Sequence, residues 1–182
     1  MTIQLRGSDD SVYSNDIVAP NLPTQGQIAG YQQGVWTPEL ASSDNTSVYT
    51  FDTQEGIWSR IGSMVTVHFY IQLASKTVSG GGVQVVVGVP YELISDDSGG
   101  RLFHGSVARA NSWTQTFMPS ACSMQIYSGR TCVTLRSNNN TDNTAYVSIG
   151  PGRSSDGALI GGSITYQTDD TTWTPINGAT LS

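Results

Sequence analysis

Charged side chains are scarce in this 182-residue chain. Only 12% of its residues are Asp, Glu, Lys or Arg, and lysine occurs once and glutamate three times. Exposed faces of helices usually carry many of these two residue types, so the composition excludes a helical bundle. Val, Ile, Thr, Tyr, Phe and Trp together make up 63 residues. The sequence therefore predicts an all-β protein whose outer surface is rich in hydroxyl and amide groups.

Basic residues are fewer than acidic ones. The chain has 8 Lys and Arg against 14 Asp and Glu, which gives a formal net charge of −6. Binding to nucleic acid through phosphates needs clustered basic side chains. Here the basic residues are scattered singly from Arg6 to Arg153. We therefore expect no nucleic-acid partner.

Long apolar segments are missing as well. No run of about 18 apolar residues occurs, so we expect no insertion into a membrane. Residues Met1 to Asp10 lack the apolar core of a secretory signal, so we expect synthesis in the cytoplasm without a cleavable signal.

Cysteine and histidine occur only twice each, in no metal-binding spacing, and we expect no metal site. Cys122 and Cys132 flank Ser128-Gly129, which is typical of a tight hairpin turn. A two-residue loop pairs Gln125 with Cys132 and Cys122 with Leu135. Because side chains alternate along a strand, the two sulfurs point to opposite faces, and we expect no disulfide.

No group of residues predicts catalysis or a cofactor. His68 and His104 lie within predicted strands, where packed or interface roles are commoner than base catalysis. The acidic pairs Asp96-Asp97 and Asp169-Asp170 are predicted to be solvated turn charges, because adjacent residues rarely direct both carboxylates at one substrate. Gly80-Gly81-Gly82 precedes neither a helix nor a lysine, so it is not a phosphate-binding loop. We expect a protein that is not an enzyme.

Residues 1–33 differ from the rest of the chain. Pro20 and Pro23 prevent a regular element at the end of this segment. A disordered leader is one interpretation. The segment nevertheless carries many apolar side chains, which favours an extended arm that becomes ordered on a partner. These side chains are Ile3, Leu5, Val12, Tyr13, Ile17, Val18 and Leu22.

Residues 34–182 show nine or ten short strand signals separated by turns, which predicts an antiparallel sandwich or jelly roll. The clearest strand is 64–73, with one apolar face and one mixed face that holds His68 and Tyr70. We predict a further strand over 101–110, followed by a loop over 111–120 that exposes Trp113, Phe117 and Met118. A second polar loop contains Asn138, Asn139 and Asn140, and 160–168 is predicted to close the sheet.

One pattern resembles a known module. Gly34-Val35-Trp36-Thr37-Pro38 is followed by Tyr49-Thr50, by 54–62 (QEGIWSRIG), by Val65-Thr66-Val67 and by Gly88-Val89-Pro90-Tyr91. This order resembles the Gly-x-Trp-Thr-Pro domains of tailed-bacteriophage virion proteins, which occur in tail fibres, tail spikes and head fibres. Trp58, Arg60 and Tyr91 stand where that module usually has Tyr, Lys and Phe.

The resemblance implies a jelly-roll β-sandwich that acts as a homotrimer in the virion. Trp36 and Trp58 are then expected to pack in the core, although a sugar-binding platform is an alternative. Burial of the mixed face holding His68 and Tyr70 in a three-fold interface suits a small domain with a modest core.

The functional hypothesis is a short tail fibre or receptor-binding tip. The arm 1–33 would bind other tail or capsid proteins, and the domain 34–182 would bind a host-surface ligand, with a glycan favoured. Candidate binding residues are Trp113, Phe117, Met118, Asn138, Asn139 and Asn140, although such loops are often plain turns and Trp113 suits a trimer core. The alternative is a capsid decoration, cement or head-fibre protein that binds the phage head. A polysaccharide depolymerase is a weaker hypothesis, because no suitable carboxylate pair is evident.

Overall fold

The computed structural model describes residues 30–94, 103–113, 119–127, 130–137 and 147–182. The predicted arm residues Ile3, Leu5, Val12, Tyr13, Ile17, Val18 and Leu22 lie outside these ranges. The predicted domain boundary at Gly34 falls inside a strand, because β1 begins at Tyr31. Residues 31–33 therefore belong to the folded sheet.

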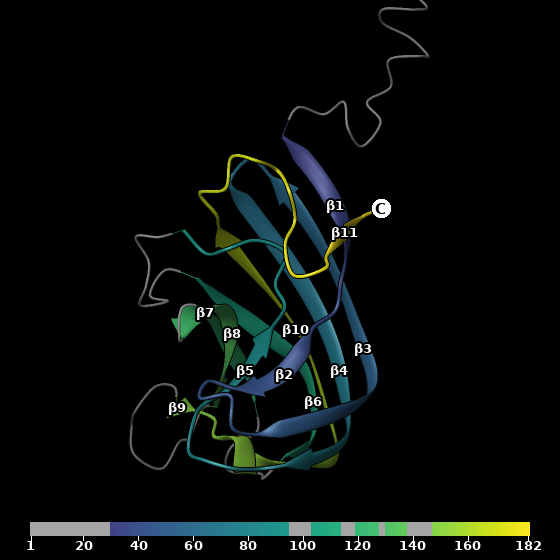
Figure 1. Cartoon of the computed structure of the whole chain (residues 1–182), viewed down its shortest axis with the longest axis vertical. Coiled ribbons are helices and arrows are strands. Elements are labelled where there is room, and N and C mark those ends of the chain that lie inside the picture. The colour runs from purple at the N-terminus through teal and green to yellow at the C-terminus, as the bar shows by residue number, and fades with distance from the viewer. Residues whose placement is uncertain (1–29, 95–102, 114–118, 128–129, 138–146) are drawn as a thin grey trace, which may run out of the picture.

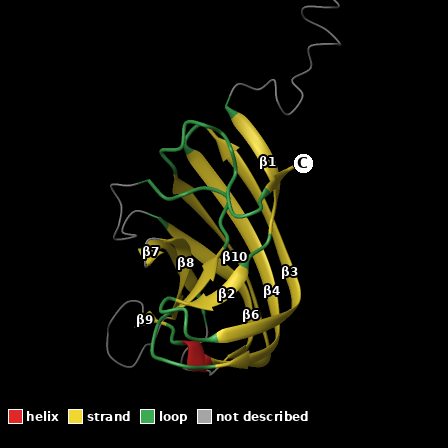
Figure 2. Ribbon diagram, in the orientation of Figure 1, coloured by secondary structure: helices red, strands yellow, loops and turns green. Residues whose placement is uncertain are grey.

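The described chain is an all-β structure with antiparallel pairing throughout (Figure 2). One short 3-10 turn, η4 (Pro151–Arg153), precedes β10. No helix in the described ranges is long and apolar enough to cross a membrane. The strands are β1 (Tyr31–Trp36), β2 (Glu39–Ser42), β3 (Val48–Ile61), β4 (Met64–Thr77), β5 (Gln84–Val87), β6 (His104–Trp113), β7 (Ala121–Tyr127), β8 (Arg130–Ser137), β9 (Val147–Ser148), β10 (Ser154–Gln167) and β11 (Thr180–Leu181).

The strands form one curled sheet in the order β11-β1-β3-β4-β10-β6-β7-β8-β5-β2, with β9 paired to β8 (Figure 1). Thr37-Pro38 separates β1, near one end of this order, from β2 at the other end. Pro38 has no N–H to donate to a strand partner, so pairing with β3 stops there and pairing with β5 begins at Glu39. The sheet thus curls so that β1 and β2, from opposite ends of the strand order, are connected by only two residues.

The long hairpin of β3 and β4 confirms the predicted alternation. Strand β4 pairs with β3 on one side and with β10 on the other. Its alternate apolar side chains are at most 4% exposed and line the core. These core side chains are Val65, Val67, Phe69, Ile71 and Leu73. His68 is exposed and Tyr70 is half-buried on the opposite face, as predicted.

Two glycine–tryptophan pairs explain the spacing of the Gly-x-Trp motifs. Gly34 pairs with Trp58, and Trp36 pairs with Gly56. Trp36 and Trp58 are 4% and 2% exposed, which confirms their packing in the core. A Cβ on Gly56 would lie 2.5 Å from Trp36 Nε1, and one on Gly34 would lie 2.8 Å from Trp58 Nε1. The Trp36 indole therefore occupies space that only Gly56 leaves open, whereas a Cβ on Gly34 would also lie 1.7 Å from the Thr180 carbonyl oxygen, so Gly34 accommodates both Trp58 and β11.

The two indoles differ in hydrogen bonding, which gives a matched test. Trp36 Nε1 donates to the carbonyls of Ile57, at 3.3 Å, and His68, at 3.1 Å. Trp58 Nε1 is buried and has no acceptor in the described residues. We expect Trp36→Phe to lower the free energy of unfolding by about 1–2 kcal/mol more than Trp58→Phe. Urea unfolding of the two variants at one protein concentration measures this difference, and equal losses would contradict it.

The hairpin of β7 and β8 has the predicted register. Gln125 pairs with Cys132 and Cys122 with Leu135, so the two cysteines lie on opposite faces. Both are buried, and they are not joined by a disulfide, as expected. Burial raises the pKa of the Cys122 thiol to about 12.

This burial has a chemical consequence, because the thiolate is the reactive form. We expect both cysteines to react slowly with a maleimide in the native protein at pH 8. Both should react fully after unfolding in denaturant with no reducing agent. Mass spectrometry counts the added groups, and a denatured chain with no adducts would reveal a disulfide.

Two predictions about the second half of the chain are wrong. Strand β6 continues past Ala110 to Trp113, since Asn111 pairs with Leu159 and Trp113 pairs with Ser154. Trp113 is only 6% exposed, so it is not in an exposed loop. The segment predicted to close the sheet belongs to β10, which lies inside the strand order between β4 and β6.

Candidate functional site

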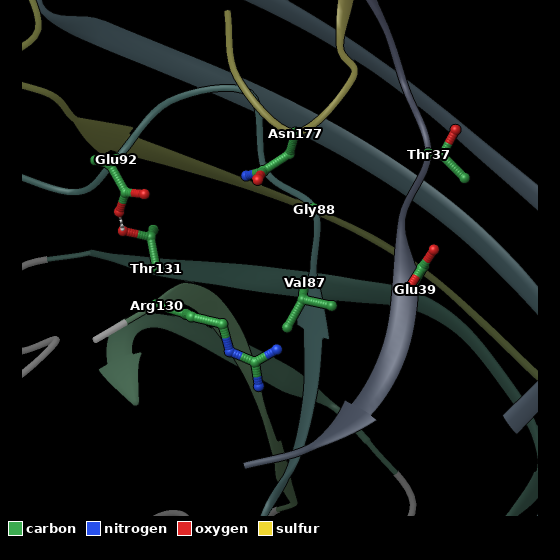
Figure 3. A pocket seen from close by; sticks show the side chains of 8 residues that line it. All are labelled: Thr37, Glu39, Val87, Gly88, Glu92, Arg130, Thr131 and Asn177. Carbon is green, nitrogen blue, oxygen red and sulfur yellow. Dashed lines mark hydrogen bonds between the residues drawn. The ribbon is translucent and has the colours of Figure 1, made fainter. Parts of the chain in front are cut away.

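A polar pocket of about 320 Å³ lies where β2, β5 and β8 approach the C-terminal segment (Figure 3). Figure 3 shows Glu92, Arg130 and Asn177 on one side of the Val87–Gly88 segment and Thr37 and Glu39 on the other. Its lining residues are Thr37, Glu39, Val87, Gly88, Glu92, Arg130, Thr131 and Asn177.

Gly88 brings two walls of the pocket together. Its φ is +90°, a conformation that glycine adopts without strain. A Cβ at this position would lie 2.6 Å from the carbonyl oxygen of Thr37. The end of β5 can therefore pass directly against the connection between β1 and β2, which carries Thr37 and leads to Glu39.

Hydrogen bonds hold the Glu92 side of the pocket. The buried hydroxyl of Thr131 donates to Glu92 Oε2 at 2.5 Å and accepts from the backbone N–H of Leu93 at 2.8 Å. The Asn177 amide donates to the carbonyl of Val89 at 2.8 Å. These bonds position one carboxylate and one amide at the pocket from segments far apart in the sequence.

Arg130 is the basic residue of this pocket. One of its Nη atoms donates to Oδ1 of Asn45. Its Nε atom is buried and has no acceptor in the described part of the chain. A buried N–H without a partner costs about 1–3 kcal/mol, so this part of the arginine does not stabilise the fold.

A cluster around Arg60 fixes the C-terminal segment that bears Asn177. Arg60 is 2% exposed, and its Nη1 lies 2.7 Å from Asp170 Oδ2. Its guanidinium carbon lies 3.9 Å from the Trp173 ring centre and 4.5 Å from that of Tyr91. These contacts tie the segment after β10 to strand β3 by ion pairing and cation–π attraction.

Asp170 differs from the predicted solvated turn charge. Burial opposes its ionisation, but hydrogen bonds from Thr172, Arg60 and Trp173 outweigh this effect and lower its pKa to about 2. The prediction is therefore wrong for Asp170. The carboxylate serves structure by neutralising Arg60.

The outer face of β1, β3, β4 and β10 is a second candidate surface. Cross-strand pairing aligns three rows of side chains on it, and none of the twelve residues is Asp, Glu, Lys or Arg. The rows are Val35-Ile57-His68-Ser163, Gln33-Ser59-Thr66-Thr165 and Tyr31-Ile61-Met64-Gln167. We call these twelve residues the outer face. Depletion of charge is typical of the centre of a protein interface.

Several apolar side chains of the outer face are strongly exposed. Val35 is 49% exposed, Ile57 58%, Ile61 67% and Met64 40%. Val35 and Ile57 are direct cross-strand neighbours, as are Ile61 and Met64. The face therefore presents adjacent apolar groups instead of isolated ones, which marks a candidate interaction site.

Of the predicted binding residues, Trp113 is the one that lies in the described part of the chain. Trp113 is buried, and its Nε1 donates to the Leu159 carbonyl at 3.0 Å, so its predicted role as an exposed ligand contact is corrected. Phe117, Met118, Asn138, Asn139 and Asn140 lie outside the described residues. No group of three or more potential metal-binding side chains occurs within the described ranges.

Sequence reasoning missed the polar pocket because its residues come from five separated segments. One signal was available: two of the three glutamates of the chain, Glu39 and Glu92, line it. Their convergence depends on the strand order, which places β2 beside β5 and β5 beside β8.

Comparison with known proteins finds a match in structure. No family model and no curated protein sequence matches the chain. The fold is similar to part of the crystal structure of the Dettilon tailspike protein, with a TM-score of 0.54 and 14% sequence identity over 75% of this chain. The matched part is 24% of that tailspike, so the chain corresponds to about a quarter of its length. The chain therefore has a fold that also occurs as part of a phage tailspike.

Proposed function

We propose that this chain is a virion protein of a tailed bacteriophage, located in the tail as a short fibre or receptor-binding tip. The observation that carries the proposal is the shared fold with part of a tailspike. The proposal includes a jelly-roll type of domain and attachment to a ligand on the host surface. It includes no catalytic step.

The motif arrangement supports the same assignment. The residues that resemble the phage Gly-x-Trp-Thr-Pro module are those that build the Gly34–Trp58 and Trp36–Gly56 pairs. Thr37-Pro38 ends β1 and lets the chain enter β2 at the other end of the sheet. The resemblance thus rests on residues with a defined structural task.

The outer face supports a homotrimer. Exposure of Val35, Ile57, Ile61 and Met64 to water is unfavourable, and association of subunits through this face would bury them. The face includes His68, next to Ile57 across the strands, and its twelve residues carry no charged side chain, while Glu55 borders them opposite Tyr70 in the next row. The proposed subunit interface therefore includes the mixed face of strand 64–73, for which the sequence predicted a three-fold interface.

The arm, predicted as residues 1–33, is proposed to attach the trimer to other virion proteins. Its last three residues, Tyr31–Gln33, belong to strand β1 of the sheet. A phage lacking the gene should be complemented with the full chain or with a chain that begins at Gly30, where the described domain starts. We expect the full chain in purified particles and at least tenfold less of the truncated chain by quantitative mass spectrometry. Equal incorporation would place the attachment surface on the domain.

A further inference from the structure

We propose that the polar pocket binds an uncharged sugar residue and discriminates against acidic sugars. The choice of a saccharide rests on the proposed role in host attachment. The preference for an uncharged ring rests on the side chains of the pocket. Neither the outer face nor the predicted loop residues are needed for this site.

The pocket has the size and the groups for a polyhydroxylated ligand. Its volume of about 320 Å³ lies at the lower end of the range for small-molecule sites. The Arg130 guanidinium supplies donors, the Glu39 and Glu92 carboxylates supply acceptors, and the Thr37 hydroxyl supplies both. Each hydroxyl of a sugar both donates and accepts, so it matches walls that offer both kinds of group.

Aromatic stacking is not the basis of this site. All four tryptophans lie in the described residues, and Trp36, Trp58 and Trp113 are buried in the core. Trp173 packs against Arg60. None of the four lines the pocket, so recognition there depends on hydrogen bonds and charge.

The charges of the pocket set its selectivity. Glu39 and Glu92 contribute two negative charges and Arg130 one positive charge, so the lining is net negative. One Arg130 Nη atom is already engaged by Asn45, and Glu92 receives the Thr131 hydroxyl. The Glu39 side chain is exposed and makes no hydrogen bond or ion pair with the described residues. Asn45 is neutral and does not compensate the Arg130 charge, so a ligand carboxylate would be attracted by one guanidinium and repelled by two carboxylates, with net repulsion.

The position of Arg130 at the pocket lowers the stability of the fold. Its Nε atom is buried without an acceptor, which a neutral side chain would avoid. A residue kept at such a cost is more readily explained by ligand binding than by folding. Arg130→Gln should therefore weaken binding and leave the melting temperature within about 2 °C of the parent chain.

The test uses two pairs of sugars that differ only at C6: galactose with galacturonic acid, and glucose with glucuronic acid. The purified full chain is titrated with each at pH 7.5 and followed by NMR. We expect millimolar binding of at least one neutral sugar, with at least tenfold weaker binding of its acid. Failure of both neutral sugars to bind at 50 mM, or equal binding of the acid, would overturn the proposal.

Variants assign the selectivity to the pocket. Glu39→Gln should reduce the preference for the neutral sugar at least threefold, and Arg130→Gln should weaken binding of the neutral sugar at least fivefold. Asp52→Asn and Arg109→Gln change the same charges at exposed positions outside the pocket and should alter neither value. Unchanged selectivity in Glu39→Gln would place the ligand elsewhere. Incorporation into phage particles is measured separately, so failure of the sugar site leaves the virion assignment intact.

Discussion

Ile57→Glu should convert the proposed trimer into monomers. Ile57 is 58% exposed and lies between Val35 and His68 in one of the three rows of the outer face. Three-fold association would bury a carboxylate from each subunit in an uncharged interface, at a cost of several kcal/mol per charge. Analytical ultracentrifugation should give a mass near three times the 19.4 kDa of one chain for the parent protein, and one chain mass for the variant.

Val48→Glu is the matched control for this experiment. Val48 is 64% exposed and begins β3, nine residues before Ile57, which is about 30 Å along an extended strand. This variant should remain trimeric and should unfold at the same temperature as the parent. A parent protein that sediments as a monomer at micromolar concentration, or a trimeric Ile57→Glu variant, would contradict the proposed interface.

Asp170→Asn should produce the largest loss of stability among the charge substitutions. It leaves the guanidinium of Arg60, which is 2% exposed, without its anionic partner. Breaking a fully buried pair costs about 3–5 kcal/mol. Because the Asp170 side chain is 22% exposed, we expect a smaller loss of about 2–3 kcal/mol. Urea unfolding at one protein concentration measures it, with Asp52→Asn as a control that should change little.

The pH dependence identifies the cause of that loss. The pKa of Asp170 is lowered to about 2 from its ordinary value of 3.8, so its ionised form stabilises the fold above about pH 4. This contribution falls as the pH drops from 4 toward 2, where the carboxylate is protonated. The stability difference between the parent and Asp170→Asn should therefore shrink over this range. A difference that stays constant down to pH 2 would point to altered packing instead of a lost ion pair.

Local features of the fold were predictable because neighbouring residues determine them. The alternation of strand 64–73 and the register of the hairpin around Ser128-Gly129 depend on side-chain periodicity and loop length. The end of β6 was not predictable in this way. Residues Asn111 and Ser112 are polar and indicate a loop, but β10 supplies the partners of Asn111 and Trp113.

The outer face and the polar pocket also differ in how far they can be predicted from local sequence. The outer face follows from the period-two pattern of adjacent strands, so His68 could be assigned to it from sequence, with Tyr70 in the neighbouring row on the same side of the sheet. The polar pocket requires Glu39, Glu92, Arg130 and Asn177 to meet, and these residues are separated by many strands. Likewise, Asp170 gave no local sign of its partner Arg60, which precedes it by 110 positions.

The position of the chain on the phage particle tests the proposed function most directly. Particles that carry an epitope tag inserted after Gly81, an exposed residue between β4 and β5, can be labelled with an antibody fragment and imaged by cryo-electron microscopy. A tail fibre or receptor-binding tip predicts label at the tail only, in three-fold groups. Label distributed over the capsid would contradict this assignment and favour a decoration or head-fibre protein, and particles without label would contradict a virion role.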